Sequence, residues 1–301
     1  MAAQCPGQGP STQGGSRAEG SRAVGSRISG ALMRAFLVVI AIATPSILLP
    51  GISGDAKQLV ALAALFAGCL TFIEYNSDYP SVTEFRDAAP YNRLRFVMLL
   101  ATVLGLTMIE RGRTDPNSLT ELSRAIGHLI GKAADFPYSP VRLATLMLAD
   151  SATPEQVMIV RDAAGLAYFT SLVTLSIFVT LVYLQSWPLR TQPFNVWVNL
   201  PTFDPTVGGD VVGRLERDGR VNIALGFLLP FVTPFFVSLA SHGLNPLSLT
   251  SPQTLIWTMT LWAFLPASLF MRGIAMGRVA DLIRAARLAR DRAADDRLAT
   301  A

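Results

Sequence analysis

The most extended apolar run of the chain is Ala163–Trp187, with the sequence AAGLAYFTSLVTLSIFVTLVYLQSW. It contains no charged side chain, and it exceeds the about 20 residues that a helix needs to cross a hydrocarbon layer about 30 Å thick. It ends in Tyr183 and Trp187, whose amphipathic rings suit the headgroup level of a bilayer. The run therefore predicts a transmembrane helix.

Composition extends this prediction to the rest of the chain. Of the 301 residues, 51% are hydrophobic and 15% are charged, and the mean hydropathy is +0.41, which is unusual for a soluble protein. Five more apolar runs are candidates, so the six predicted spans are about 35–52, 59–75, 94–110, 163–187, 222–241 and 254–272. We therefore predict an all-α fold: a polytopic membrane helical bundle of six transmembrane helices, occupying residues 31–272.

Two of the predicted spans need a further argument, the third because it is short and the first because it could be a signal peptide. The third is the shortest, and it crosses the bilayer only if Arg95 and Glu110 at its two ends extend toward the interfaces. The first has an alternative interpretation as a signal peptide, because Ala41–Ala43 resembles a cleavage site. The polar region before it is too long for a signal peptide, and the apolar run continues past Ala43, so a retained span is preferred.

The distribution of basic residues predicts the orientation. They are concentrated before the first span, between the second and third, between the fourth and fifth, and after the sixth, whereas loop 241–253 contains none. Because cytoplasmic segments are enriched in Lys and Arg, this pattern places the N- and C-termini in the cytoplasm. Lys57 and Lys132 are the only lysines among 25 basic residues, an arginine bias typical of GC-rich bacterial genes. The predicted location is a bacterial inner (plasma) membrane.

Three segments are predicted to lie outside the bilayer. Residues 1–30 are rich in Gly, Ser and Arg, which predicts a disordered cytoplasmic tail. The outer excursion 111–162, between spans three and four, is too long for an unstructured connection. Its apolar residues between Leu119 and Ile130 share one helical face, which predicts an amphipathic helix on the membrane surface or over the mouth of the bundle. Residues 273–301 are predicted to form a basic cytoplasmic helix or tail, bound to the anionic leaflet or to a partner, or simply solvated.

The loop after the second span, Tyr75–Arg95, mixes acidic, arginine and tyrosine side chains in the sequence YNSDYPSVTEFRDAAPYNRLR. This mixture suits a folded loop with internal ion pairs, which could be a surface that docks a partner. The alternative is ordinary turn chemistry, with the acidic side chains solvated near the headgroups. The candidate docking residues are Glu74, Asp78, Glu84, Arg86, Asp87 and Arg93.

Small residues and prolines mark positions inside the spans. Small residues four apart allow two helices to approach closely, and the candidates are Ala64 with Gly68 and Ala101 with Gly105. Prolines bend helices and free backbone carbonyls. The candidate span kinks are Pro45, Pro230, Pro234 and Pro266.

Several classes of chemistry have little support. His128 and His242 are the only histidines and have no metal-ligand spacing; no nucleotide or catalytic motif occurs, so we predict no cofactor, metal site or catalytic site. His128 lies opposite the apolar face of its predicted helix, beside Arg124, and is either a ligand-binding or proton-responsive residue or part of a solvated charged face, the preferred interpretation. Topology explains the basic residues, so no nucleic acid is predicted as a partner.

We therefore expect a non-enzymatic scaffold, assembly factor or subunit of a membrane complex, with the lipid bilayer and a membrane-protein partner or a second copy as partners. The alternative is a transporter or channel for a small, uncharged solute, with a polar path along the hydroxyls of the fourth span and the proline bends. A membrane-embedded enzyme is the least favoured interpretation, because the carboxylates between Glu74 and Asp87 would have to converge beneath the bundle.

Overall fold

The computed structural model describes residues 13–149, 151–184, 187–188, 199–203, 209–243, 249 and 251–299, with side chains described from residue 25 and not for 240–243. The regular structure of these residues is helical, as predicted. The elements are α1 Gln13–Leu48, α2 Gly54–Asn76, α3 Tyr91–Arg111, α4 Ser118–Ala133, α5 Pro140–Ala144, a 3-10 turn Thr145–Met147, α6 Pro154–Leu184, α8 Val211–Gly243 and α9 Pro252–Ala299.

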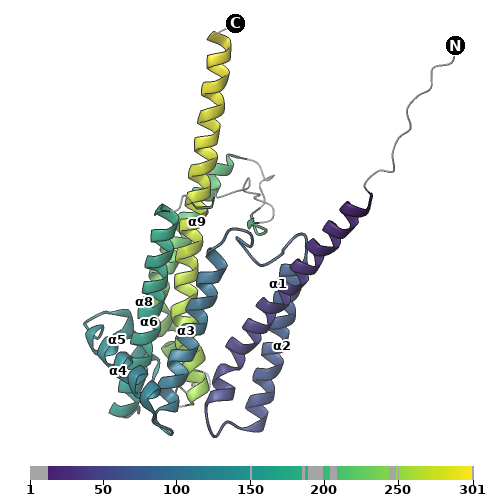
Figure 1. Cartoon of the computed structure of the whole chain (residues 1–301). Helices are drawn as coiled ribbons and strands as arrows, with labels where there is room; N and C mark the ends of the chain where they lie inside the picture. Colours follow the sequence, from purple (N-terminus) through teal and green to yellow (C-terminus); the bar gives the residue numbers. More distant parts are fainter. Residues whose placement is uncertain are drawn as a thin grey trace, which may run out of the picture.

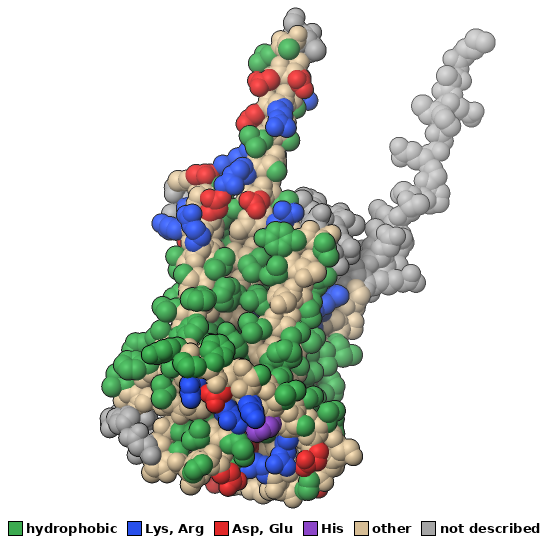
Figure 2. All heavy atoms as spheres, turned by 90° about the vertical axis from the view of Figure 1, so that its left-hand side faces the viewer, with side chains coloured by type: hydrophobic (Ala, Val, Ile, Leu, Met, Phe, Trp, Pro, Cys, Tyr) green, Lys and Arg blue, Asp and Glu red, His purple; other side chains and the backbone are tan. Residues whose placement is uncertain are grey.

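Six of these helices are long and apolar enough to cross a membrane: α1 from Gly25, then α2, α3, α6, α8 and α9. They coincide with the six predicted spans, so the chain is a multi-pass membrane protein. The third helix has 21 residues, longer than the apolar run suggested, because its first turn contains the polar residues Tyr91–Arg95. Figure 2 shows an apolar band around the middle of the molecule, with charged side chains gathered at its two ends.

The helices form a main bundle and a hairpin beside it. In the bundle, α8 lies along α9, and α6 packs against both α9 and α3. The hairpin of α1 and α2 stands to one side and reaches α3 through α1 (Figure 1). Helices α4 and α5 cover one end of the bundle, and both termini leave from the other end (Figure 1). An even number of spans requires this arrangement of the termini.

The two ends of the bundle each have a buried core. At the end covered by α4 and α5, side chains such as Leu106, Val141 and Met259 pack together. At the end of the termini, Trp187 packs against Phe85 and Phe178, with ring centroids 5.6 and 5.8 Å away. Helix α6 ends at Leu184, and the indole of Trp187 is buried in the protein; its depth at the headgroup level stays a prediction.

The amino-terminal segment differs from the prediction of a disordered tail over residues 1–30. Residues 1–12 lie outside the described part of the chain, but α1 is helical from Gln13. Its Arg27 donates a hydrogen bond to the carbonyl of Ser77 at 3.1 Å and pairs with Asp78 at 2.8 Å. The composition suggested that this segment has too little apolar surface to fold. The contacts of Arg27 with the loop between α2 and α3 are tertiary contacts that composition does not reveal.

The carboxyl-terminal segment is a continuation of the sixth span. Helix α9 has 48 residues and runs on beyond the bundle in the direction of the span (Figure 1). Residues 273–299 are therefore helical, and binding of this segment to the leaflet or to a partner stays a prediction. Near the point where it leaves the bundle, α9 also contacts the start of α8, where Arg287 pairs with Asp210 at 2.7 Å.

Glycines set the closest helix contacts. A Cβ atom on Gly68 would lie 2.6 Å from Val39 of α1, and one on Gly105 would lie 2.9 Å from Leu166 of α6. Ala64 is buried beside α1, whereas Ala101 is exposed, so the second predicted pair contributes Gly105 alone to this contact. The tightest contact between spans lies elsewhere, at Gly273 of α9, where a Cβ would be 2.5 Å from the carbonyl oxygen of Gly219.

The four candidate kink prolines lie inside continuous helices, Pro45 in α1, Pro230 and Pro234 in α8, and Pro266 in α9. Proline has no N–H, so Pro234 leaves the carbonyl of Pro230 without its helical partner. The indole Nε1 of Trp262 in α9 donates to that oxygen at 3.1 Å. This bond satisfies the freed carbonyl inside the bundle and ties α8 to α9. A change of helix direction at the four positions stays a prediction.

We predict that Gly273→Ala lowers the free energy of unfolding by about 1–3 kcal/mol, because the added methyl must push α8 away from α9. Gly277→Ala, one turn further along α9, is the control: no atom lies within 4 Å of its Cβ position. It should leave stability unchanged or raise it by up to about 1 kcal/mol through helix propensity. Unfolding of the purified protein in mixed micelles with increasing SDS measures both; equal effects would contradict the close contact.

Candidate functional site

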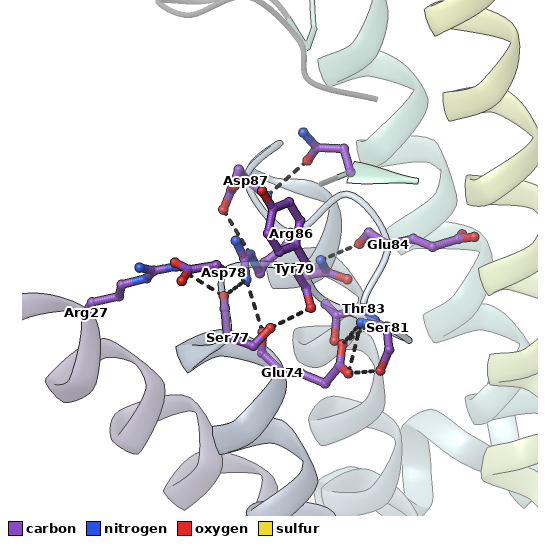
Figure 3. A network of polar contacts seen from close by, with 12 residues as sticks. Arg27, Glu74, Ser77, Asp78, Tyr79, Ser81, Thr83, Glu84, Arg86 and Asp87 are labelled. Atoms are coloured by element: carbon purple, nitrogen blue, oxygen red, sulfur yellow. Dashed lines mark hydrogen bonds and ion pairs between the residues drawn. The ribbon is translucent and has the colours of Figure 1, made fainter. Parts of the chain in front are cut away.

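The loop between α2 and α3 is organised around Glu74 (Figure 3). This carboxylate is buried near the end of α2. It accepts hydrogen bonds from the Ser81 hydroxyl and from the backbone N–H groups of Ser81, Val82 and Thr83, the last at 2.8 Å. A single side chain thus holds three successive residues of the loop. Glu74 therefore fixes the start of the loop in place.

Arg86 closes the same loop onto the end of α2 (Figure 3). Its Nη1 donates to the carbonyls of Glu74 at 3.1 Å and Ser77 at 2.6 Å. The last carbonyls of a helix have no partner within the helix, and an arginine placed there satisfies them. Asp87 lies beside Arg86, with its Oδ1 3.4 Å from Nε. Arg86 is therefore a structural cap for α2.

Glu84 connects the loop to the sixth span. Its carboxylate accepts from Nε of Arg272 at 2.7 Å and from Nη2 at 2.9 Å, a two-point contact. Thr202 donates to the same carboxylate, and the other arm of Arg272 donates to Asn222 of α8 at 3.1 Å. The side chain of Glu84 is 10% exposed and that of Arg272 is 28% exposed. The pair therefore joins two loops, α8 and α9 at the end of the bundle where the termini lie.

The six candidate docking residues divide into two groups. Glu74, Glu84 and Arg86 are directed into the protein and bonded there. Asp78, Asp87 and Arg93 are exposed, and Asp78 pairs with Arg27 of α1. A partner at this surface would meet the second group. Every carboxylate oxygen of Glu74 and Glu84 already accepts a hydrogen bond from the protein.

The opposite end of the bundle has a cavity of about 850 Å³ between the end of α3, α4 and the start of α6. Its wall includes Glu110, whose Oε2 accepts from Arg113 at 3.1 Å. The other oxygen, Oε1, is enclosed and has no hydrogen-bond partner among the residues that the structure describes. On the cavity's other side, His128 Nδ1 lies 3.1 Å from Asp162 Oδ2. This cluster at the end of the bundle is not apparent in the sequence, which places Asp162 34 residues from His128.

Glycines bring His128 and Asp162 together. A Cβ atom on Gly165 of α6 would lie 2.5 Å from Cα of Gly131 in α4, and one on Gly127 would meet Ile109 of α3 at 2.8 Å. Helix α4 therefore lies against the bundle on its glycine face. The apolar face is directed away, with Leu119, Leu122, Ile126 and Leu129 exposed. This direction agrees with the expected amphipathic helix at a membrane interface.

A smaller cavity of about 250 Å³ lies between α6, α8 and α9, beside Pro230 and Pro266. Its wall is mainly apolar, with Leu172, Phe231 and Phe270 among its residues. Ser171 of the fourth span lies in this wall, and its hydroxyl donates to the carbonyl of Tyr168 at 2.7 Å. Thr170, Thr174, Ser176 and Thr180 each donate to a carbonyl four residues earlier in α6. A polar path for a small, uncharged solute along α6 stays a prediction.

Among the described residues, no group of three or more His, Cys, Asp or Glu side chains is arranged to hold a metal ion. Comparison with known proteins identifies no family for this chain. No family model, curated protein or solved structure matches it.

We predict that Glu84→Gln lowers the free energy of unfolding by about 2–3 kcal/mol, because it leaves Arg272 without its counter-charge in a largely buried position. Asp78→Asn is the matched control, since it removes a charge from an exposed pair in the same loop and should cost less than about 1 kcal/mol. SDS titration of both purified variants checks the difference. Equal, small losses would show that the Glu84–Arg272 contact does not hold the loops together.

Proposed function

We propose that this chain is a non-enzymatic scaffold, assembly factor or subunit of a membrane complex in a bacterial inner membrane, with both termini in the cytoplasm. The observation that carries the proposal is the projection of α9 beyond the bundle as a single helix (Figure 1). A protein that acts by assembly needs a surface fixed in place and open to a partner, and this helix has both properties.

The base of the projecting helix is fixed by charged contacts to the start of α8. Arg284 pairs with Glu216, and Arg287 donates to Asp210 at 2.7 Å. The hydrogen bond from Arg287, together with one from the backbone N–H of Gly213, lowers the pKa of Asp210 below its usual range. Asp210 therefore stays ionised and keeps its bond to α9 well below neutral pH.

Beyond Arg287 the described side chains of the helix, residues 288–299, are all exposed. Leu288 is 52% exposed and Leu298 is 79% exposed. A helix of this length without tertiary packing is marginally stable in water. Burial of its two leucines against another helix would stabilise it by about 1.5–3 kcal/mol per side chain. A helical protein surface, from a partner or from a second copy, is the occupant that best fits this segment.

The alternative function, transport of a small uncharged solute, has weaker support. The cavity beside Pro230 and Pro266 is the feature that favours it. Its apolar wall suits an apolar molecule or part of a lipid chain, and the α6 hydroxyls are bonded within their own helix. Purification with a stoichiometric bound solute and no protein companion would favour transport.

We expect that the double change Leu288→Glu and Leu298→Glu reduces partner or self-association by about tenfold or more, since it removes both apolar contacts of the projecting helix. Ala293→Glu is the control, because it adds a charge on the opposite face of the same helix. The measurement is cross-linking in native membranes, followed by purification in mild detergent. Mass spectrometry then identifies the proteins bound to the chain and their stoichiometry. A wild-type chain that is monomeric and without a stoichiometric companion would contradict the proposal.

The proposed orientation has its own test. We expect Asp78→Cys to react with a membrane-impermeant maleimide only after the inner membrane is permeabilised, and Glu155→Cys to react in intact spheroplasts, because these exposed residues lie at opposite ends of the bundle. A background with Cys5 and Cys69 changed to Ser removes competing thiols. The reverse pattern of labelling would place the termini outside.

A further inference from the structure

We propose that the cavity beside Glu110 binds a ligand through a primary ammonium group, which comes either from a free amine or from the headgroup of an aminophospholipid. This site lies at the opposite end of the bundle from the proposed docking helix and is independent of the proposed function. Its support comes from charge, from an unsatisfied carboxylate oxygen, and from its position.

The charge of the cavity wall favours a cation. Carboxylates outnumber guanidinium groups in the wall, with Glu110, Glu121, Glu155 and Asp162 against Arg113 and Arg124. Arg124 is engaged by Glu121 at 3.0 Å, and Arg161, outside the wall, pairs with Asp162 at 3.2 Å. Arg113 is shared, 3.1 Å from Glu110 and 3.9 Å from Glu155. One guanidinium group therefore serves two carboxylates, which leaves negative charge in the cavity.

Glu110 supplies the specific contact. Its side chain is 2% exposed, and Arg113 occupies Oε2 alone. A buried polar atom without a partner costs about 1–3 kcal/mol, and more when the group is charged. Oε1 is enclosed in this structure, so a donor in the cavity would reach it only after a shift of the surrounding side chains, and the bond would then recover this free energy. The adjacent carboxylate of Glu155 would hold the same cation from the open side.

A primary ammonium group fits these acceptors better than other cations do. It carries three N–H donors, whereas a quaternary ammonium group has none and would leave Oε1 unsatisfied. A metal ion is disfavoured, because no three carboxylate or histidine side chains of the described chain converge. Ile109, Met158 and Ile159 line the cavity as well, and these side chains suit the carbon atoms next to an amine.

The position of the cavity allows both sources of the amine. It is bounded by α4, whose side chains Leu119, Leu122 and Leu129 are exposed, as expected of a helix at a membrane interface. It also opens at the end of the bundle, among charged side chains that face water. A lipid headgroup would enter from the interface, and a free amine would enter from solution. Both sources present the same primary ammonium group, and binding experiments with defined probes distinguish them.

The test measures binding to the full chain with defined probes. Putrescine and ethanolamine are titrated in detergent with thermal stability as the readout, and native mass spectrometry compares nanodiscs of phosphatidylethanolamine with nanodiscs of phosphatidylcholine. Saturable stabilisation by either free amine identifies a soluble ligand. Selective retention of phosphatidylethanolamine without any response to free amines identifies a lipid headgroup. Failure of both probes overturns the proposal.

The variants locate the site. Glu110→Gln keeps the shape of the side chain but loses its charge, and it should weaken the observed binding by about tenfold or more. Asp115→Asn is the control, because Asp115 pairs with Arg111 at 2.7 Å and is outside the cavity wall. If Glu110→Gln does not fold, Glu155→Gln at an exposed position tests the site instead. We expect it to weaken binding of the amine probe by about threefold or more. Wild-type binding in the folded carboxylate variants overturns the proposal.

Discussion

Hydrocarbon offers no hydrogen-bond partner to a peptide group, and this constraint governs the whole structure. It makes every span a helix, and it turns the hydroxyls of α6 back onto their own backbone. It also explains the bond from Trp262 to the carbonyl of Pro230, because Pro234 has removed the usual donor. Polar side chains that bond to one another are left to the two ends, where Glu84 meets Arg272 and Glu110 meets Arg113.

The spans were predictable because they depend on local properties. Length and hydropathy alone indicate six helices, and the arginine distribution agrees with an even number. Contacts between segments far apart in the sequence were not predictable in the same way. Glu74 and Glu84 are charged residues in a polar stretch, which suggests an exposed surface. Both are buried, because Ser81 donates a hydrogen bond to Glu74 and Arg272 donates one to Glu84. The sequence contains these residues but not the geometry that pairs them.

The glycine contacts between helices were also difficult to predict from the sequence. A search for small residues four apart detects Gly68 and Gly105, but the closest approach between spans involves Gly219 and Gly273, which belong to different helices. No spacing within one helix can reveal such a pair. The cavity at Glu110 was hidden for a related reason: Gly131 and Gly165 bring α4 onto α6, and only then do His128 and Asp162 face each other.

The continuity of α9 has a mechanical consequence. At 1.5 Å per residue, its 48 residues span about 70 Å, more than twice the hydrocarbon thickness. No loop separates the part packed among α3, α6 and α8 from the part that projects. Arg284 and Arg287 bond to the start of α8 at the point where the projecting part begins. A change in the tilt of the sixth span would therefore also change the direction of the projecting part, because both belong to one helix.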